Sequence, residues 1–148
     1  MTLWDTAGQE RFKCLPKKYY QNADGVLLLF DVTNEDTFNN VTNWMKDVKE
    51  NSNKDGNQSE IALYLIGNKI DKPDRVISKE TAETQAKSLG MKYFEVSCKI
   101  NMNIPEVMAR MIMECHMRTN HINGSFPIGP DEPDIPRKKG CCNDKSKH

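Results

Sequence analysis

The sequence lacks long apolar segments and any excess of one charge sign. Its apolar runs, such as Val26 to Phe30, are far too short to cross a bilayer. Lysine and arginine number 21 together, as do aspartate and glutamate, so no overall positive field is present to attract nucleic acid. These absences argue against a membrane span in this sequence and against a nucleic-acid partner.

The sequence also lacks the cysteine spacings of zinc fingers and disulfide-rich scaffolds. Its five cysteines are odd in number and mostly scattered: Cys14, Cys98, Cys115, Cys141 and Cys142. This usage is typical of reduced thiols in a cytosolic protein. No G-x-G-x-x-G segment occurs either, which disfavours a dinucleotide-dependent dehydrogenase.

The chain of 148 residues has the size and composition of one ordinary globular domain, with 37% apolar and 28% charged residues. Continuous apolar runs predict buried strands, and apolar residues three or four apart predict helices. The expected strands are 25–32, 61–67 and 92–96. The expected helices are one that Thr33-Asn34 caps and that runs to about residue 50, and those at 78–89 and 105–118. This alternation predicts an α/β fold with a parallel sheet.

Two further features concern the ends of this domain. Thr2 to Trp4 is expected to be the tail of another strand. The last helix is expected to bury the stripe Val107, Met108, Met111, Ile112 and Cys115. From residue 120 onward prolines and glycines interrupt any periodicity, so residues 1–119 are interpreted as the domain and 120–148 as a flexible tail.

The strongest local motif is Asn68-Lys69-Ile70-Asp71, directly after a buried strand. Ligands bind at the carboxyl ends of strands in open parallel sheets. A carboxylate there accepts two hydrogen bonds from guanine, whereas adenine presents an acceptor instead. The Lys69 stem suits the base, and Asn68 suits a contact between neighbouring loops. The alternative is a polar turn ahead of Pro73.

A second candidate is Glu95-Val96-Ser97-Cys98-Lys99, at the end of the next predicted strand. Its backbone N–H groups and Lys99 suit the base carbonyl and the sugar of a nucleotide. Taken alone it reads as a surface loop. Its position one strand–helix unit after Asp71 places both loops at the same edge of the sheet.

The third segment runs Trp4-Asp5-Thr6-Ala7-Gly8-Gln9-Glu10-Arg11-Phe12. It resembles the DxxG region and second switch of Ras-superfamily small GTPases. The segment at Asn68 resembles their NKxD element, and that at Glu95 their E-x-S-A-K element. Arg11 to Leu15, Tyr19 to Ala23 and Leu28 to Thr33 are similar to the Rab family in particular.

This resemblance implies a doubly wound parallel sheet of the small-GTPase type and roles for matching positions. Asp5 would hold Mg²⁺ through a water, Gly8 would contact the γ-phosphate, and Gln9 would orient the attacking water. The guanine base of GTP or GDP would be bound by Asn68, Lys69 and Asp71, with Ser97, Cys98 and Lys99 in support. Cys98 stands where the family usually has alanine, but the contact there belongs to the backbone.

The phosphate-loop pattern G-x-x-x-x-G-K-[ST] occurs nowhere in the sequence. By the resemblance, the first strand, phosphate loop, first helix and first switch would precede Met1, so we expect a chain truncated at its N-terminus. Backbone donors and a lysine for the phosphates are then missing, which predicts weak or absent GTP binding and negligible hydrolysis. The strand at 25–32 would become an open edge.

The tail carries Cys141-Cys142 after Arg137, Lys138 and Lys139. Paired cysteines near a basic tail resemble the double prenylation site of Rab proteins, which anchors through two lipid chains. Six residues follow the pair, more than is usual in that family, so an unmodified tail is the alternative. Prenylation would place the protein at the cytoplasmic face of an intracellular membrane as well as in the cytosol.

The leading hypothesis is therefore a Rab-like GTPase that acts as a switch in vesicle-mediated membrane traffic. Its effectors, exchange factor and GTPase-activating protein would contact Gly8 to Tyr20. One alternative is a nucleotide-free module that sequesters such effectors or exchange factors. A poorly folded product is the other.

Overall fold

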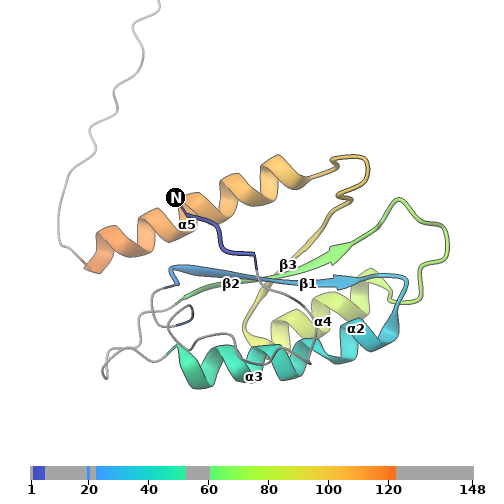
Figure 1. Ribbon diagram of the computed structural model, residues 1–148, viewed down its shortest axis with the longest axis horizontal. Coiled ribbons are helices and arrows are strands. Elements are labelled where there is room, and N and C mark those ends of the chain that lie inside the picture. The colour runs from blue at the N-terminus through green and yellow to red at the C-terminus, as the bar shows by residue number, and fades with distance from the viewer. Residues whose placement is uncertain (1, 6–19, 21–22, 53–60, 123–148) are drawn as a thin grey trace, which may run out of the picture.

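The computed structural model describes residues 2–5, 20, 23–52 and 61–122. Its elements, shown in Figure 1, are β1 (Gly25–Asp31), α2 (Glu35–Asn39), α3 (Val41–Asn51), β2 (Ala62–Asn68), α4 (Lys79–Leu89), β3 (Lys92–Glu95) and α5 (Ile104–Ile122). The predicted alternation of strands and helices is confirmed. No helix in these ranges is both long enough and apolar enough to cross a membrane.

The strands form one sheet in the order β1-β2-β3, and both pairings are parallel. In the register Asp31 lies beside Asn68, and Gly67 lies beside Glu95. Parallel strands bring their carboxyl ends to the same edge, so the segments that follow all three strands meet there. This register positions the candidate site.

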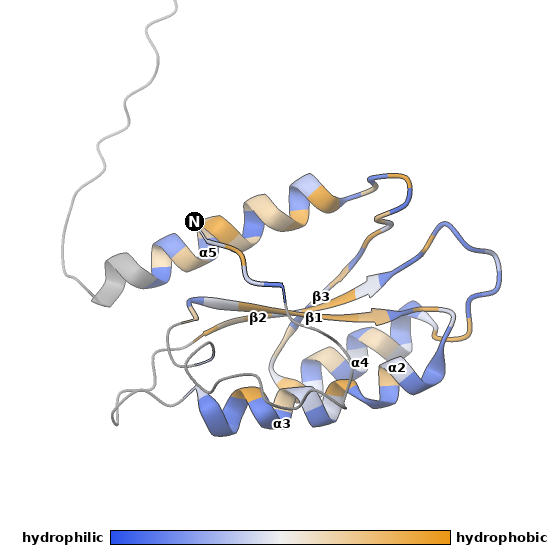
Figure 2. Cartoon of the chain, viewed as in Figure 1, coloured by the Kyte–Doolittle hydropathy of each residue, from blue (hydrophilic) through white to orange (hydrophobic). Residues whose placement is uncertain are grey.

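The sheet is the middle of three layers, with α5 on one face and α2, α3 and α4 on the other (Figure 1). Each face has its own apolar core. Phe30, Leu65 and Met45 belong to the cluster under α2, α3 and α4. Tyr64, Ile66 and Met111 belong to the cluster under α5. Apolar residues alternate with polar ones along α3 (Figure 2), as expected for a helix that buries one side.

Helix α4 begins and ends where the sequence predicts. The Ser78 side chain accepts a hydrogen bond from the Thr81 N–H at 3.1 Å, which caps its N-terminus. Gly90 ends it in the left-handed region with φ +75°, a conformation that favours glycine.

The helix predicted to run without a break from the Thr33-Asn34 cap to about residue 50 is divided into two helices, which meet at Asn40. The Asn40 N–H donates to the Asp36 carbonyl, and Asn40 ends α2 before α3 begins at Val41. The Asn40 Oδ1 accepts a hydrogen bond of 2.9 Å from the side-chain amide of Asn43. The side chain of Asn34 caps the first of the two helices.

Two expectations at the ends of the domain are also wrong. Residues 2–5 are exposed and form no strand; a strand needs a hydrogen-bonded neighbour, and the described sheet pairs only β1, β2 and β3. Ile112 is 44% exposed and lies off the buried stripe. It follows Met111 by one residue, which turns its side chain about 100° around the helix. The helix also continues to Ile122, beyond the expected end at 118.

Candidate functional site

The two loops predicted to converge do meet at the carboxyl edge of the sheet. The Ser97 hydroxyl donates a hydrogen bond of 2.5 Å to Oδ1 of Asp71. Ser97 is fully buried, and Asp71 lies in the turn after β2. The juxtaposition predicted for these two loops is therefore present.

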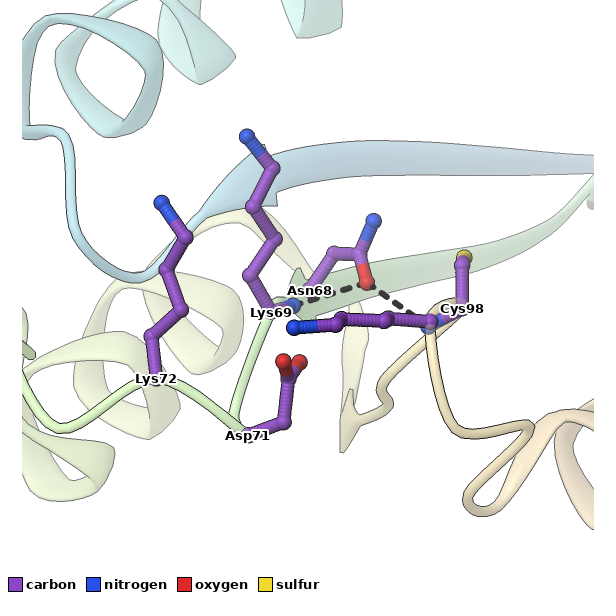
Figure 3. A pocket seen from close by; sticks show the side chains of 6 residues that line it. Asn68, Lys69, Asp71, Lys72 and Cys98 are labelled. Carbon is purple, nitrogen blue, oxygen red and sulfur yellow. Dashed lines mark hydrogen bonds between the residues drawn. The ribbon is translucent and has the colours of Figure 1, made fainter.

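Asn68 connects the same two loops from the end of β2. Its Oδ1 accepts a hydrogen bond from the Cys98 N–H at 3.2 Å and another from the Lys69 N–H at 2.7 Å, drawn as dashed lines in Figure 3. This is the connecting role expected for Asn68. It also engages the Cys98 N–H, the backbone donor that the resemblance assigns to a ligand.

The chain turns sharply between Asn68 and Asp71. Lys69 has φ +69°, in the left-handed region that non-glycine residues adopt uncommonly. The Ile70 N–H then donates to the Val96 carbonyl at 3.4 Å, which holds this turn against the neighbouring loop. The side chains of Lys69 and Asp71 leave the turn in different directions (Figure 3).

Lys69 forms an ion pair that the sequence reading missed. Its Nζ lies 2.5 Å from Oδ2 of Asp31, the last residue of β1. Burial raises the pKa of Asp31, but hydrogen bonds from Lys69 and Thr33 outweigh burial and lower the pKa to about 2. The same hydrogen bond with Asp31 raises the pKa of Lys69. Asp31 ends a strand beside Asn68, so the strand-end rule that selected Asn68 also points to Asp31.

An open cleft of about 300 Å³ lies between the two loops (Figure 3). It is lined by Asn68, Lys69, Asp71, Lys72, Cys98 and Lys99. The hydrogen bond from Ser97 lowers the pKa of Asp71, and the positive charges of Lys99 and Lys72 lower it further. Asp71 is therefore ionised at neutral pH and offers a carboxylate acceptor to a ligand that carries N–H donors.

The loop after β3 is stabilised by residues that the sequence reading did not select. Ser97 and Met102 exchange two backbone hydrogen bonds, at 3.2 and 3.0 Å. The Asn103 side chain donates to the Glu95 carbonyl at 2.9 Å. Asn101 and Asn103 both have positive φ, for which asparagine is enriched. The presence of two asparagines in one short loop is the sequence signal that could have indicated these left-handed positions.

Of the remaining predicted site residues, Asp5 is the one that the structure describes. Asp5 is exposed and is not among the residues that line the cleft. Gly8, Gln9, Cys141 and Cys142 lie outside the described residues, as does most of the segment Gly8 to Tyr20. Trp4, which precedes Asp5, is 64% exposed.

Asp5 is the described residue that the family resemblance assigns to Mg²⁺. No group of three or more His, Cys, Asp or Glu side chains within the described residues gathers at metal-binding distances. Mg²⁺ is usually held by one or two carboxylates together with waters and substrate phosphates, so Asp5, an exposed carboxylate, is the described residue that would hold the ion through a water.

Similarity to known proteins identifies the family of this chain. Residues 1–117 match the model of the Ras family. The chain is 38% identical over 135 residues to Ras-related protein Rab-8B of Bos taurus, covering 88% of this chain and 63% of that protein. It is 42% identical over 117 residues to Ras-related protein SEC4 of Saccharomyces cerevisiae, covering 77% and 52%.

A third relative is Ras-related protein Rab-21 of Mus musculus, 38% identical over 158 residues, with 97% of this chain and 69% of that protein covered. The chain spans somewhat less than two thirds of the length of most of these relatives. It belongs to the Ras family of small GTPases, and the relatives that it matches are of the Rab type.

Proposed function

We propose that this chain carries the guanine-recognising part of a Rab-type GTPase, and that the cleft between Asp71 and Lys99 takes the base of GTP or GDP. The observation that carries the proposal is the hydrogen bond of 2.5 Å from Ser97 to Asp71, whose side chain lines that cleft. It orients an ionised carboxylate at the place where the family motif puts the guanine-reading group.

The chemistry of the two purines supports guanine over adenine. Guanine presents two neighbouring donors, its N1–H and its exocyclic amine, and the carboxylate of Asp71 has acceptor oxygens for both. Adenine presents an unprotonated N1 to the same carboxylate, so one pair of acceptors would face each other. A site built around hydrogen bonds to a ligand rejects an analogue that lacks the matching donors.

Binding of the whole nucleotide is expected to be weak. Most of the affinity for a triphosphate comes from phosphate contacts, which a phosphate loop supplies through backbone N–H groups and a lysine. No segment of the sequence has that pattern. Submicromolar affinity for a fluorescent GTP analogue would contradict this expectation.

The wider role is carried over from the family. A Rab-type switch orders its second switch region around Gly8 when GTP is bound and releases it on hydrolysis, with Gln9 positioning the water. We infer the same use for this chain in vesicle-mediated membrane traffic. Effectors and regulators would bind at Gly8 to Tyr20, and prenylated Cys141 and Cys142 would attach the tail to a membrane.

The proposal is tested by titrating the ¹⁵N-labelled protein with GMP and, separately, with AMP. The dissociation constants are obtained from the shifts of the Lys69, Ser97 and Cys98 amide signals. The constant for GMP is expected to be at least about tenfold lower than that for AMP. Asp71→Asn should remove this preference. Asp74→Asn is the matched control, because Asp74 is exposed and does not line the cleft. Equal shifts with both nucleotides would refute guanine recognition.

A further inference from the structure

Lys69 lines the cleft and forms an ion pair with Asp31. This pair does not include Asp71, the carboxylate that is proposed to bind the base. We propose that Asp31 is a positioning residue for guanine binding: it holds the Lys69 ammonium at the end of β1 and so keeps it away from Asp71. This inference rests on the proposed function, since it concerns the same cleft.

Asp31 is itself firmly held by hydrogen bonds. Its Oδ1 accepts hydrogen bonds from the Thr33 N–H at 2.9 Å and the Thr33 hydroxyl at 2.8 Å. Its backbone N–H donates to the Thr37 hydroxyl at 3.0 Å. The side chain is only 14% exposed. One carboxylate oxygen is thus fixed by its own turn, and the other is left to face Lys69.

The Lys69 side chain points towards the end of β1. The parallel register places Asp31 beside Asn68, and the left-handed turn at Lys69 directs its side chain towards β1. In Figure 3 the Lys69 side chain rises towards the end of β1 and away from the Asp71 carboxylate below it. Its side chain is 47% exposed and lines the cleft, so the methylene stem forms part of the cleft wall while Asp31 neutralises the charge.

The ion pair with Asp31 leaves the Asp71 carboxylate without the Lys69 ammonium as a competing partner. A lysine has a long flexible stem, and a free ammonium near a carboxylate pairs with it. Asp71 contributes only the smallest of the effects that raise the pKa of Lys69, whereas Asp31 contributes the largest. Without Asp31, Lys69 would be free to turn to Asp71 and compete with the N–H donors of guanine. Lys99 and Lys72 also act on Asp71, but Asp31 holds neither of them in the structure.

A double-mutant cycle tests this by GMP titration. Asp31→Asn removes the charge while keeping an oxygen for Thr33, and Lys69→Met keeps an apolar stem without the ammonium. With Lys69 present, Asp31→Asn should weaken GMP binding about three- to fivefold. In the Lys69→Met background it should change GMP binding by less than about 1.5-fold. An equal loss in both backgrounds, or no loss with Lys69 present, would overturn the inference.

Asp36→Asn is the matched control, because it removes the same charge from an exposed residue in the first turn of α2. If Asp31→Asn does not fold by circular dichroism, Thr33→Val replaces it. That variant removes one hydroxyl donor to Asp31 and should give a smaller loss of the same sign. A loss that is unchanged by Lys69→Met would again overturn the inference.

A second readout needs no nucleotide and separates this inference from the proposed function. The carboxyl ¹³C signal of Asp71 is titrated with acid in each variant. Asp31→Asn should lower the pKa of Asp71 further when Lys69 is present, because the released ammonium pairs with it, and should leave it unchanged beside Lys69→Met. If GMP does not bind at all, the proposed function fails, and this titration alone decides whether Asp31 restrains Lys69. An unchanged Asp71 pKa with Lys69 present would overturn the inference.

Discussion

Ser97 is a buried polar side chain whose hydroxyl serves the candidate site. It donates to Asp71 at 2.5 Å and accepts a hydrogen bond from the Ile100 N–H at 3.4 Å. Buried polar groups are costly unless they are paired, and both contacts pair this one. Ser97 therefore connects the conformation of the loop after β3 to the charge of the Asp71 carboxylate in the turn after β2.

The first prediction concerns that connection. Ser97→Ala removes the donor that lowers the pKa of Asp71, so this pKa should rise towards its ordinary value. A rise means that Asp71 takes up its proton at a higher pH than before, and GMP binding should fade at correspondingly higher pH on acidification. The measurement is the carboxyl ¹³C titration of Asp71, with and without GMP.

Ser88→Ala provides the control for that experiment. Ser88 is exposed on α4, where its hydroxyl donates only to the Gln85 carbonyl of the same helix. It should leave the titration of Asp71 unchanged. An Asp71 pKa that does not move in Ser97→Ala would show that the Ser97 hydrogen bond does not govern the carboxylate.

Cys98 shows how a side chain and its backbone can have separate roles. Its thiol is exposed in the cleft, while its N–H donates to Asn68. A guanine carbonyl that uses this N–H must share it with Asn68 or displace it. The residue type at 98 matters little to that contact, because the donor belongs to the backbone.

At the scale of elements, the attachment of α5 to the sheet depends on a buried carboxylate. Glu114 accepts hydrogen bonds from Tyr64 at 2.8 Å, from Lys92 at 2.7 Å and from Arg118 at 2.7 Å. Burial raises the pKa of Glu114, but these three donors outweigh burial and lower the pKa from 4.5 to about 2. Burial and the same contact with Glu114 raise the pKa of Tyr64 to about 12.

The second prediction follows from the direction of that shift. A folded-state pKa below the unfolded value stabilises the fold above pH 4.5, and this stability is lost as the pH falls towards about 2. Glu114→Gln should therefore lower the free energy of unfolding by about 2 kcal/mol at pH 7. The difference from the unmodified chain should shrink steadily between pH 5 and pH 2 in urea unfolding followed by circular dichroism.

A glutamate on the same helix serves as its control. Glu106 is exposed and pairs with Arg110 one turn away. Such surface pairs contribute little, so Glu106→Gln should cost less than about 0.5 kcal/mol at any pH. A Glu114→Gln deficit that persists undiminished at pH 2 would refute the assignment of the pH dependence to this carboxylate.

At the scale of the whole molecule, β1 is an edge strand of the described sheet. It pairs only with β2, which leaves the hydrogen-bonding groups along its other side without a strand partner in the described residues. Leu29 in the middle of this strand is 55% exposed. An exposed, apolar edge strand is a template for pairing between chains, as the sequence reading expected for 25–32.

The third prediction is that Leu29→Lys reduces self-association of this chain. A charge on an edge strand opposes strand pairing between molecules and costs little where the side chain is already exposed. The apparent mass measured by light scattering should rise with concentration less steeply than in the unmodified chain. Far-UV circular dichroism should be unchanged.

Val76→Lys is the matched variant, since Val76 is 59% exposed but lies outside the strands. It should leave the concentration dependence as it is. If Leu29→Lys and Val76→Lys behave alike, the edge of β1 does not mediate association.

Several features were determined by the sequence alone because their causes are local or periodic. Ser78 and Gly90 supply the cap and the left-handed end of α4. The continuous apolar runs at 25–32 and 61–67 predicted buried strands of a parallel sheet with helices on each side. The sheet and its helices are confirmed, and β2 is buried as predicted. The predicted burial is wrong for β1, which is mostly half-buried with Leu29 55% exposed, because it is an edge strand of the described sheet. The strand-end rule then placed Asp71 and Ser97 at one edge.

Only the tertiary structure decided which side chains pair across that edge. Asp31 and Lys69 are far apart in the sequence, and nothing in either segment specifies the partner; the register of β1 against β2 brings them together. Glu114 reads as an ordinary polar residue of an amphipathic helix until the packing of α5 places it against Tyr64 and Lys92. Strand register and the angle of a helix over a sheet depend on contacts between distant segments, and these create pairings that local patterns do not contain.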